Sequence, residues 1–169
     1  MLLTNRSSIL LPKMNKTQVF TELCNKLQDE LNVALGASRD AADYATNEEA
    51  RADSKYDTQG LEASYLAAGQ ASFARKVAEA VADLKILQDE LTIPRSKVMR
   101  GALVRCRLDG FEEWFYICPV GGGETLEVEG VEISILTGQS PLGSSILGKT
   151  VGDRFTLTSG LTGEILEVA

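Results

Sequence analysis

The residues best suited to chemistry lie in one polar stretch, NEEARADSKYDTQG, which runs from Asn47 to Gly60. Its charged and aromatic members are Glu48, Glu49, Arg51, Asp53, Lys55, Tyr56 and Asp57. Asp53 and Asp57 are four residues apart, so they share one face if the stretch is helical. Carboxylate oxygens are the ligands that Mg²⁺ prefers, and the cationic Lys55 between them weakens their combined negative charge.

This stretch has two interpretations. A charged turn between helices is most often a solvated surface without a partner. An exposed aromatic such as Tyr56 is unfavourable unless something receives it, although it can also pack on Leu61 or Tyr65. We therefore interpret the stretch as a contacting tip, and its expected contact residues are Glu48, Glu49, Lys55 and Tyr56.

The composition excludes several classes of site. The 169 residues include no histidine, which excludes a Ser-His-Asp triad, a His-ligated zinc and an imidazole base. Ser144 and Ser145 therefore lack an activating base. The PVGGGE segment has neither the spacing nor the lysine of a phosphate-binding loop. A net charge of −7 disfavours the phosphate backbone, so we expect no direct DNA binding.

The cysteines and the hydropathy indicate a cytoplasmic protein. Cys24, Cys106 and Cys118 form an odd set without a CxxC motif, which is typical of a reducing compartment. They are interpreted as small buried hydrophobes, although Cys106 and Cys118 could also face each other on paired strands. No apolar run approaches the roughly 20 residues of a membrane span, and residues 1–13 lack the features of a signal peptide.

Two halves with different patterns divide the chain. Residues 1–13 are expected to be an N-terminal extension and residues 14–92 a coiled-coil hairpin with its tip at about 47–60. Pro94 ends the helical pattern and lies in a linker over residues 93–100. Residues 101–169 are expected to form a small antiparallel β domain with one short helix, so the fold class is α+β.

Two apolar stripes support the hairpin. One has members three or four residues apart, and the other repeats this spacing closer to Pro94. The first comprises Phe20, Leu23, Leu27, Leu31, Ala34, Ala37 and Ala41, and the second Phe73, Val77, Ala80, Leu84, Leu87 and Leu91. Because the large residues begin the first stripe and end the second, we predict an antiparallel pair with a leucine-rich base and an alanine-rich far end.

The second half, residues 101–169, is predicted to form short strands separated by turns. Asp109-Gly110 predicts a tight hairpin, and Glu129-Gly130 predicts a further one. In SPLGSSILGKTVGD, Ser140 is expected to cap a short helix that has Pro141 at its first position and stops at Gly148.

These motifs carry a family resemblance. SPLGSSILGKTVGD followed by GEILEV resembles the C-terminal domain of the GreA/GreB family of bacterial transcription elongation factors, which is FKBP-like and follows an antiparallel coiled coil. EASYLAAGQ, from Glu62 to Gln70, resembles the helix after that family's tip. The resemblance covers about residues 15–169.

The resemblance implies bacterial RNA polymerase as the partner. Factors of this family dock their globular domain at the rim of the polymerase secondary channel and reach down it with the coiled coil. Two acidic tip residues then help to hold a second Mg²⁺ in the polymerase active centre, which stimulates transcript cleavage. It follows that the protein is not an enzyme by itself and binds no cofactor alone. We also expect a monomer. The docking residues implied by the resemblance are Ser140, Pro141, Leu142, Gly143 and Leu147.

The tip departs from the family pattern. Aligning the helix on Ala63 and Tyr65 puts the two acidic positions near Thr58 and Leu61, and neither is acidic. Two mechanisms follow. Either Asp53 and Asp57 supply the carboxylates, or the tip regulates the polymerase by occupying its channel.

Two further interpretations remain open at this point. The alternative function is an FKBP-like prolyl isomerase or chaperone module with a coiled-coil arm. The aromatics that could line its pocket are Phe111, Trp114, Phe115, Tyr116 and Phe155, although alternation along a strand favours a core role for them. A basic cluster of Arg95, Lys97, Arg100, Arg105 and Arg107 is either a solvated face or a patch that meets the polymerase rim or RNA.

Overall fold

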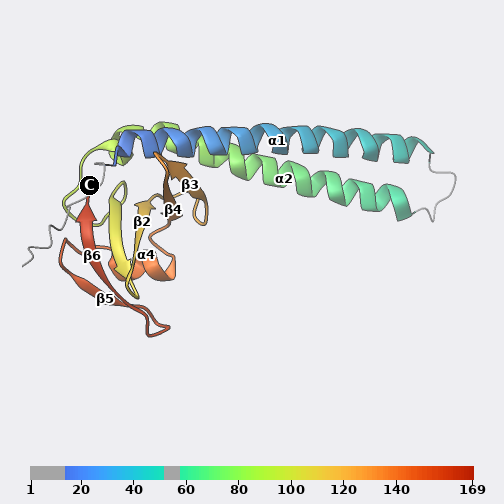
Figure 1. Cartoon of the computed structure of the whole chain (residues 1–169). Coiled ribbons are helices and arrows are strands. Elements are labelled where there is room, and N and C mark those ends of the chain that lie inside the picture. Colours follow the sequence, from blue (N-terminus) through green and yellow to red (C-terminus); the bar gives the residue numbers. More distant parts are fainter. Residues whose placement is uncertain (1–13, 52–57) are drawn as a thin grey trace, which may run out of the picture.

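The structure, a computed structural model, describes residues 14–51 and 58–169. Helices α1 (Lys16–Arg51) and α2 (Thr58–Ile86) lie side by side in an antiparallel hairpin, and α3 (Gln88–Thr92) continues toward the sheet. The hairpin extends as an arm well beyond the β domain, which lies beneath its base (Figure 1). This arrangement confirms the predicted hairpin followed by a β domain.

The β domain is a six-stranded sheet with one short helix. Its elements are β1 (Leu103–Leu108), β2 (Phe111–Ile117), β3 (Thr125–Val128), β4 (Val131–Leu136), α4 (Pro141–Ile146), β5 (Arg154–Thr156) and β6 (Thr162–Val168). The strand order is β3-β4-β2-β1-β6-β5. All neighbours are antiparallel as predicted, except that β2 and β4 pair in parallel. The parallel pair arises because β3 lies at the edge, so the chain returns to β2 in the same direction.

Two tight turns join strands at the predicted positions. Asp109 and Gly110 have φ angles of 46° and 89°, and Glu129 and Gly130 have φ angles of 53° and 76°. Consecutive positive φ angles match the right-handed twist of the flanking strands, which is why such turns dominate two-residue hairpins. The sequence signals for both hairpins are confirmed.

Helix α1 begins at a polar cap and is long. The side-chain oxygen of Asn15 accepts hydrogen bonds from the backbone N–H groups of Thr17, at 3.1 Å, and Gln18, at 3.4 Å, which satisfies otherwise unpaired donors. The helix has 36 residues, which at about 1.5 Å per residue makes an arm of roughly 54 Å. Within residues 14–51 and 58–169, no helix combines the length and apolar character needed to cross a membrane.

The side chains buried in the seam between α1 and α2 become smaller from its base to its far end. Near the base the buried side chains are large, and they include Leu23, Leu27, Val81 and Leu84. Toward the far end the buried side chains are alanines, namely Ala34, Ala41, Ala45, Ala63 and Ala74. Small side chains let helices approach closely, so the predicted change from a leucine-rich base to an alanine-rich end is confirmed.

One member of the predicted stripe on α2 is wrong. Phe73 is 47% exposed, whereas its neighbour Ala74 is 4% exposed and lies in the seam. A phenylalanine does not fit between helices held apart only by alanines, so the buried stripe passes through Ala74. The helical pattern was correct, but its phase at this end was one residue off.

The two faces of the sheet carry two separate cores. The first core joins the base of the hairpin to one face of the sheet; its members include Leu23, Leu84, Leu103, Tyr116, Ile133 and Ile135. The second core lies on the other face, beneath α4; its members include Val104, Cys106, Phe115, Ile146, Phe155 and Ile165. Adjacent residues of β1 and β2 alternate between these cores, as the pleat requires.

The suggestion that Cys106 and Cys118 face each other is wrong. Cys106 is paired with Glu113 across β1 and β2 and belongs to the core beneath α4. Cys118 follows β2 and belongs to the core beneath the hairpin. Burial raises the pKa of Cys106 to about 12 and that of Cys118 to about 11, so both are inert thiols, as the prediction of buried cysteines implies.

Two buried polar side chains tie the hairpin base to the sheet. The Tyr116 hydroxyl on β2 donates a hydrogen bond of 2.8 Å to the carbonyl of Leu91 on α3. The Lys16 ammonium at the start of α1 donates to the carbonyls of Ile93 and Gly101, the latter at 2.9 Å. Burial, reinforced by the positive charge of Arg95, lowers the pKa of Lys16 to about 8. Both side chains close the junction between the arm and the β domain.

Replacing Tyr116 by Phe should lower the free energy of unfolding by about 1 kcal/mol, because the Leu91 carbonyl loses its buried donor. Chemical denaturation followed by circular dichroism measures this change. Tyr44→Phe is the control, since Tyr44 is half exposed on α1, and its effect should stay within about 0.5 kcal/mol. Equal effects of the two substitutions would contradict the assigned role of Tyr116.

Candidate functional site

The far end of the arm is the first candidate site. α1 is described to Arg51 and α2 from Thr58, and both ends lie at the tip of the arm (Figure 1). The predicted carboxylates Asp53 and Asp57, and the predicted contacts Lys55 and Tyr56, lie outside the described residues. The structure describes the backbones of Glu48 and Glu49 as part of α1 but not their side chains. The roles of these tip residues stay predictions.

The positions that align with the family's acidic pair are described. Thr58 and Leu61 lie in the first turn of α2, and both side chains are exposed. Among residues 14–51 and 58–169, no three acidic, cysteine or histidine side chains gather as a metal site would require. The assignment of the carboxylates to Asp53 and Asp57 stays a prediction from the sequence.

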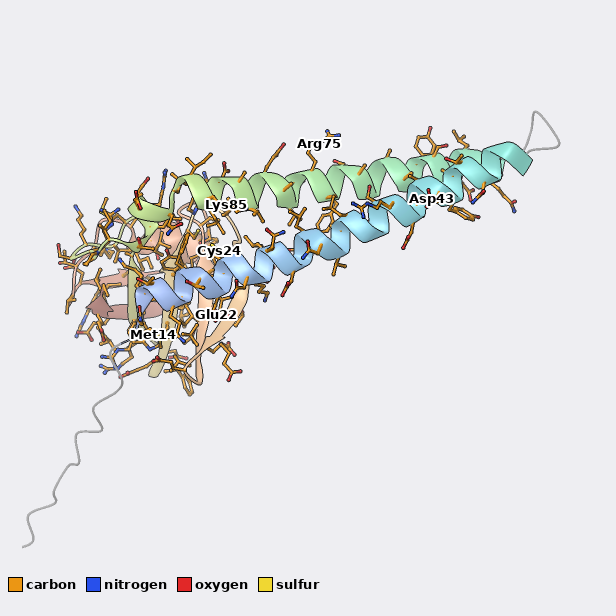
Figure 2. All side chains as sticks on the ribbon, turned by 90° about the horizontal axis from the view of Figure 1, so that it is seen from above. Met14, Glu22, Cys24, Asp43, Arg75 and Lys85 are labelled. Carbon is orange, nitrogen blue, oxygen red and sulfur yellow. The ribbon has the colours of Figure 1, made fainter. Side chains whose placement is uncertain are left out.

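The two helices of the arm differ in character toward the tip, which sequence reasoning missed. α1 carries Arg39, Asp40 and Asp43 there, whereas α2 has no charged residue from Ala63 to Ala74. Figure 2 shows Asp43 on the part of α1 that extends beyond the sheet, and Arg75 on the arm just past the uncharged stretch. The signal that could have revealed this difference is the uncharged window itself, which was interpreted only as a family motif.

The segment from Ser140 to Leu147 is the second candidate site. The Ser140 hydroxyl accepts a hydrogen bond of 3.0 Å from the Gly143 backbone N–H and donates one of 2.9 Å to the Thr137 carbonyl. Pro141 is the first residue of α4, where its missing N–H costs nothing. Gly148 follows the helix with a φ of 81°, so the predicted cap, first residue and stop are confirmed.

The predicted docking residues differ in accessibility. Pro141 is exposed and Leu147 is 41% exposed, Ser140 and Leu142 are half buried, and Gly143 is buried. Leu142 packs against the core beneath α4. A partner at this surface would therefore meet Pro141 and Leu147, while Ser140, Leu142 and Gly143 shape the corner that presents them.

A shallow cleft adjoins this corner. It has a volume of about 370 Å³, and its lining includes Arg100, Pro119, Gln139 and Leu147. One guanidinium and one exposed leucine beside it are suited to a small mixed contact with a protein surface.

The arginines of β1 are neutralised by the neighbouring strands. Arg105 lies 3.0 Å from Glu112 and 3.2 Å from Glu167, and it stacks over Trp114 at 5.6 Å from the ring centre. Arg107 lies 3.0 Å from Glu112. The hydrogen bond from Arg107, together with the charge of Arg105, lowers the pKa of Glu112.

Two of the remaining three members of the basic cluster have polar partners. Arg95 donates a hydrogen bond of 2.9 Å to the Glu90 carbonyl, and Arg100 lies 3.7 Å from the Glu90 carboxylate. For Arg100, Arg105 and Arg107 the structure therefore favours a charge-paired face, while the exposed Lys97 and the half-buried Arg95 are in no ion pair within the described residues.

The aromatic side chains of the β domain do not converge on one pocket. Phe115 and Phe155 lie in the core beneath α4. Tyr116 lies in the core beneath the hairpin, and Trp114 packs against this hairpin core. Phe111 is 72% exposed at the start of β2, so the expectation that it is a core residue is wrong. The reason is its position beside the Asp109-Gly110 turn, because Phe111 pairs with Leu108 but the first three residues of β2 are all exposed.

Comparisons with known proteins find similar structures. No family model matches the chain, and no curated protein matches it. The crystal structure of GreA factor homolog 1 of Thermus thermophilus is 16% identical, and the match covers 86% of this chain and 94% of that one with a TM-score of 0.33. The corresponding protein of Thermus aquaticus is 16% identical over 92% of this chain and 96% of that one, with a TM-score of 0.34.

A third solved structure is that of the transcription factor GreA factor homolog 1. It is 16% identical over 87% of this chain and 93% of that one, with a TM-score of 0.35. These structures come from the family that the sequence motifs resemble. At this identity and these TM-scores, the likeness adds no argument about what the chain does.

Replacing Gly143 by Ala should damage the α4 corner. A Cβ atom at this position would lie 2.0 Å from the Thr137 carbonyl oxygen and 2.7 Å from the Ser140 hydroxyl, so the capping contacts must break. We expect the free energy of unfolding to fall by about 1–3 kcal/mol, measured by denaturant titration. Gly36→Ala is the matched control, because a Cβ there meets nothing within 4 Å and alanine favours the helix by roughly 0.5–1 kcal/mol.

Proposed function

We propose that this protein binds bacterial RNA polymerase, inserts its helical arm into the secondary channel and modulates transcription elongation. The observation that supports the proposal most is the arm itself, because α1 and α2 extend far beyond the β domain and end at the charged segment of residues 47–60. The sequence resemblance of SPLGSSILGKTVGD and GEILEV to the elongation-factor family supplies the identity of the partner.

The shape of the arm suits a narrow channel. Helices that meet through alanines pack near the lower end of the usual range, with axes about 8 Å apart. The alanines in the seam, including Ala41, Ala45 and Ala63, therefore keep the far half of the arm thin. The leucine-rich base is wider and is joined to the sheet, so insertion would stop where the β domain reaches the channel rim.

The β domain would then dock at the rim. Pro141 and Leu147 are the accessible members of the segment that the resemblance implicates. Ser140 and Gly143 hold α4 at the angle that exposes them. This contact would fix the depth of insertion, while the arm determines how far the tip reaches.

Two mechanisms are compatible with this proposal. In the first, Asp53 and Asp57 contribute carboxylates to the polymerase active centre. The Mg²⁺ ion held there would supply an activated water for transcript cleavage, while this chain binds no metal alone and is not an enzyme by itself. In the second, the tip occupies the channel without promoting cleavage and excludes other factors. Both mechanisms place the protein in the cytoplasm, without direct binding to DNA or to a membrane.

The prolyl isomerase alternative receives no support from the described side chains. An isomerase pocket needs several aromatics around one hydrophobic cleft. Here Phe115 and Tyr116 face opposite sides of the sheet, and Phe111 is exposed. A chymotrypsin-coupled prolyl isomerisation assay should therefore show no activity above background.

Transcript cleavage tests the proposal and separates its two mechanisms. A stalled, backtracked complex of the cognate polymerase is incubated with and without this protein over a Mg²⁺ titration, and released 3′ fragments are measured. Under the first mechanism, release becomes faster and Asp57→Ala abolishes the stimulation while polymerase binding persists. Asp43→Ala is the matched control, since Asp43 is exposed on α1 four residues before the tip segment, and it should leave the stimulation unchanged.

The second mechanism gives a different result in the same assay. The protein alone does not stimulate cleavage, but it slows cleavage stimulated by an authentic cleavage factor, and excess factor relieves this inhibition. Absence of both effects, together with no retention of core polymerase at micromolar concentrations in a pull-down, would contradict the proposed function.

A further inference from the structure

The outward face of α2 is unusually apolar in the half of the arm beyond the sheet. From Ala63 to Ala74 the helix has no charged residue, yet Tyr65 is 70% exposed, Leu66 53% and Phe73 47%. Large apolar side chains gathered on a narrow, solvated arm are unfavourable unless another surface covers them. The described residues of this chain do not cover them.

Gly69 lies at the centre of this face, and the arm does not require a glycine there. A Cβ atom at Gly69 would meet nothing within 4 Å, so packing within the hairpin leaves room for any small side chain. Glycine in the interior of a helix is unfavourable relative to alanine. A glycine at an open position between exposed aromatics is the feature that lets a second helix approach closely.

The residues around Gly69 are complementary to themselves in reverse order. Tyr65 and Phe73 are each four residues from Gly69, and Glu62 and Lys76 are each seven residues from it. If a second α2 helix packs antiparallel with its Gly69 opposite this one, Tyr65 meets the partner's Phe73 and Glu62 meets the partner's Lys76. This reciprocity is what a two-fold symmetric interface requires.

The charges flanking the face are available for such a contact. Glu62 and Lys76 are both exposed, and within the described parts of the chain neither belongs to an ion pair. At about 100° per residue, one side of the helix carries Gly69 together with Glu62, Tyr65, Phe73 and Lys76. This side lies away from the buried stripe through Ala63 and Ala74. An apolar centre bounded by opposite charges is typical of a specific interface.

We propose that two copies of this protein associate through the outward faces of their α2 helices, with the two-fold axis at Gly69. The arms lie antiparallel, the aromatic pairs cover the apolar centre, and two Glu62–Lys76 pairs close its ends. This revises the expectation of a monomer to an equilibrium between monomer and dimer. The contact is small, so dissociation is expected on the order of micromolar.

The inference is independent of the proposed function. It depends only on α2 and can be tested without polymerase. The two are linked in one respect, because a paired arm is too wide to enter a channel that accepts a single hairpin. Self-association would therefore hold the protein in a form that does not engage the polymerase.

The first test is sedimentation velocity on the full chain from about 1 to about 200 µM, a range that brackets the expected dissociation constant. The mass should rise with concentration toward that of a dimer. Gly69→Ala should weaken the association at least about tenfold by blocking the closest approach, while the melting temperature of the monomer stays the same or rises. Gly36→Ala, at an equally open glycine on α1, should leave association unchanged.

The second test exploits the symmetry of the charges. With Glu62→Lys alone, two positive charges face each other at each end of the interface, because position 62 faces Lys76 of the other copy. With Lys76→Glu alone, two negative charges face each other there, because position 76 faces Glu62. Each variant should therefore dimerise several-fold more weakly at low salt. An equimolar mixture of the two single variants restores both opposite-charge pairs, so the mixture should form heterodimers with near wild-type affinity. In a parallel pair, Glu62 would face Glu62 and Lys76 would face Lys76, so neither single variant would weaken the homodimer. Weakening by both single variants together with recovery in the mixture therefore indicates the antiparallel arrangement.

A cysteine at the axis provides a direct geometric test. Gly69→Cys weakens the association as Gly69→Ala does, so it is oxidised mildly at the upper end of the concentration range. It should then form disulfide-linked dimers, because the two copies of this position face each other, whereas Gly36→Cys under the same conditions should not. The native Cys106 and Cys118 are buried and should not interfere, whereas the half-buried Cys24 is replaced by alanine in both variants. A chain that stays monomeric throughout the concentration range would overturn the inference, as would association that is insensitive to Gly69→Ala. Loss of polymerase binding in Phe73→Ser without any self-association of the wild type would also overturn it, since the face would then belong to a polymerase contact.

Discussion

The core shared by the base of the hairpin and one face of the sheet is the contact on which the rest of the structure depends. Leu23 and Leu84 from the helices meet Tyr116 and Ile133 from the strands in this core. A long arm acts as a lever on its attachment, so a small change at the base becomes a large displacement at the tip. The buried hydrogen bonds of Tyr116 and Lys16 close the same junction, and they fix the direction of the arm relative to the β domain.

The decrease in side-chain size along the seam links this base to the surfaces that a partner can meet. Large residues at the base separate the helices and fill the space above the sheet, whereas alanines at the far end bring the helices together. A thin seam cannot hold an aromatic side chain, so Phe73 turns outward and joins Tyr65 on the exposed face of α2. The packing rule that makes the arm slender therefore also makes one of its faces apolar.

Local sequence signals predicted the helices, turns and caps of the fold, because each of these features is determined by residues that are close together in the sequence. The turn at Asp109-Gly110, the cap at Ser140 and the spacing of the leucines all follow from backbone geometry and short-range periodicity. What failed depends on which distant residues meet. The parallel pairing of β2 and β4 and the opposite faces of Cys106 and Cys118 are set by strand register, which alternation alone does not determine.

The candidate site was predictable to a lesser degree. The cap and first residue of α4 follow from sequence, but the burial of Gly143 beside the Thr137 carbonyl is a tertiary contact. The roles of Asp53 and Asp57 rest on sequence alone. Thr58 and Leu61, the positions that align with the family's acidic pair, are not acidic, and this is a fact of the sequence to which the structure adds only their exposure.

The most direct test of the central claim is to locate the tip within the polymerase complex. Thr58→Cys, in a chain that also carries Cys24→Ala, is labelled with an iron chelate that cuts nearby protein and RNA, and the cuts are mapped. If the arm enters the secondary channel, cuts will fall beside the catalytic centre and the transcript 3′ end. A chelate at Phe111→Cys, on the β domain, should cut only near the rim. Cuts from Thr58→Cys confined to the outer surface of the polymerase, or no cuts at all, would contradict the account.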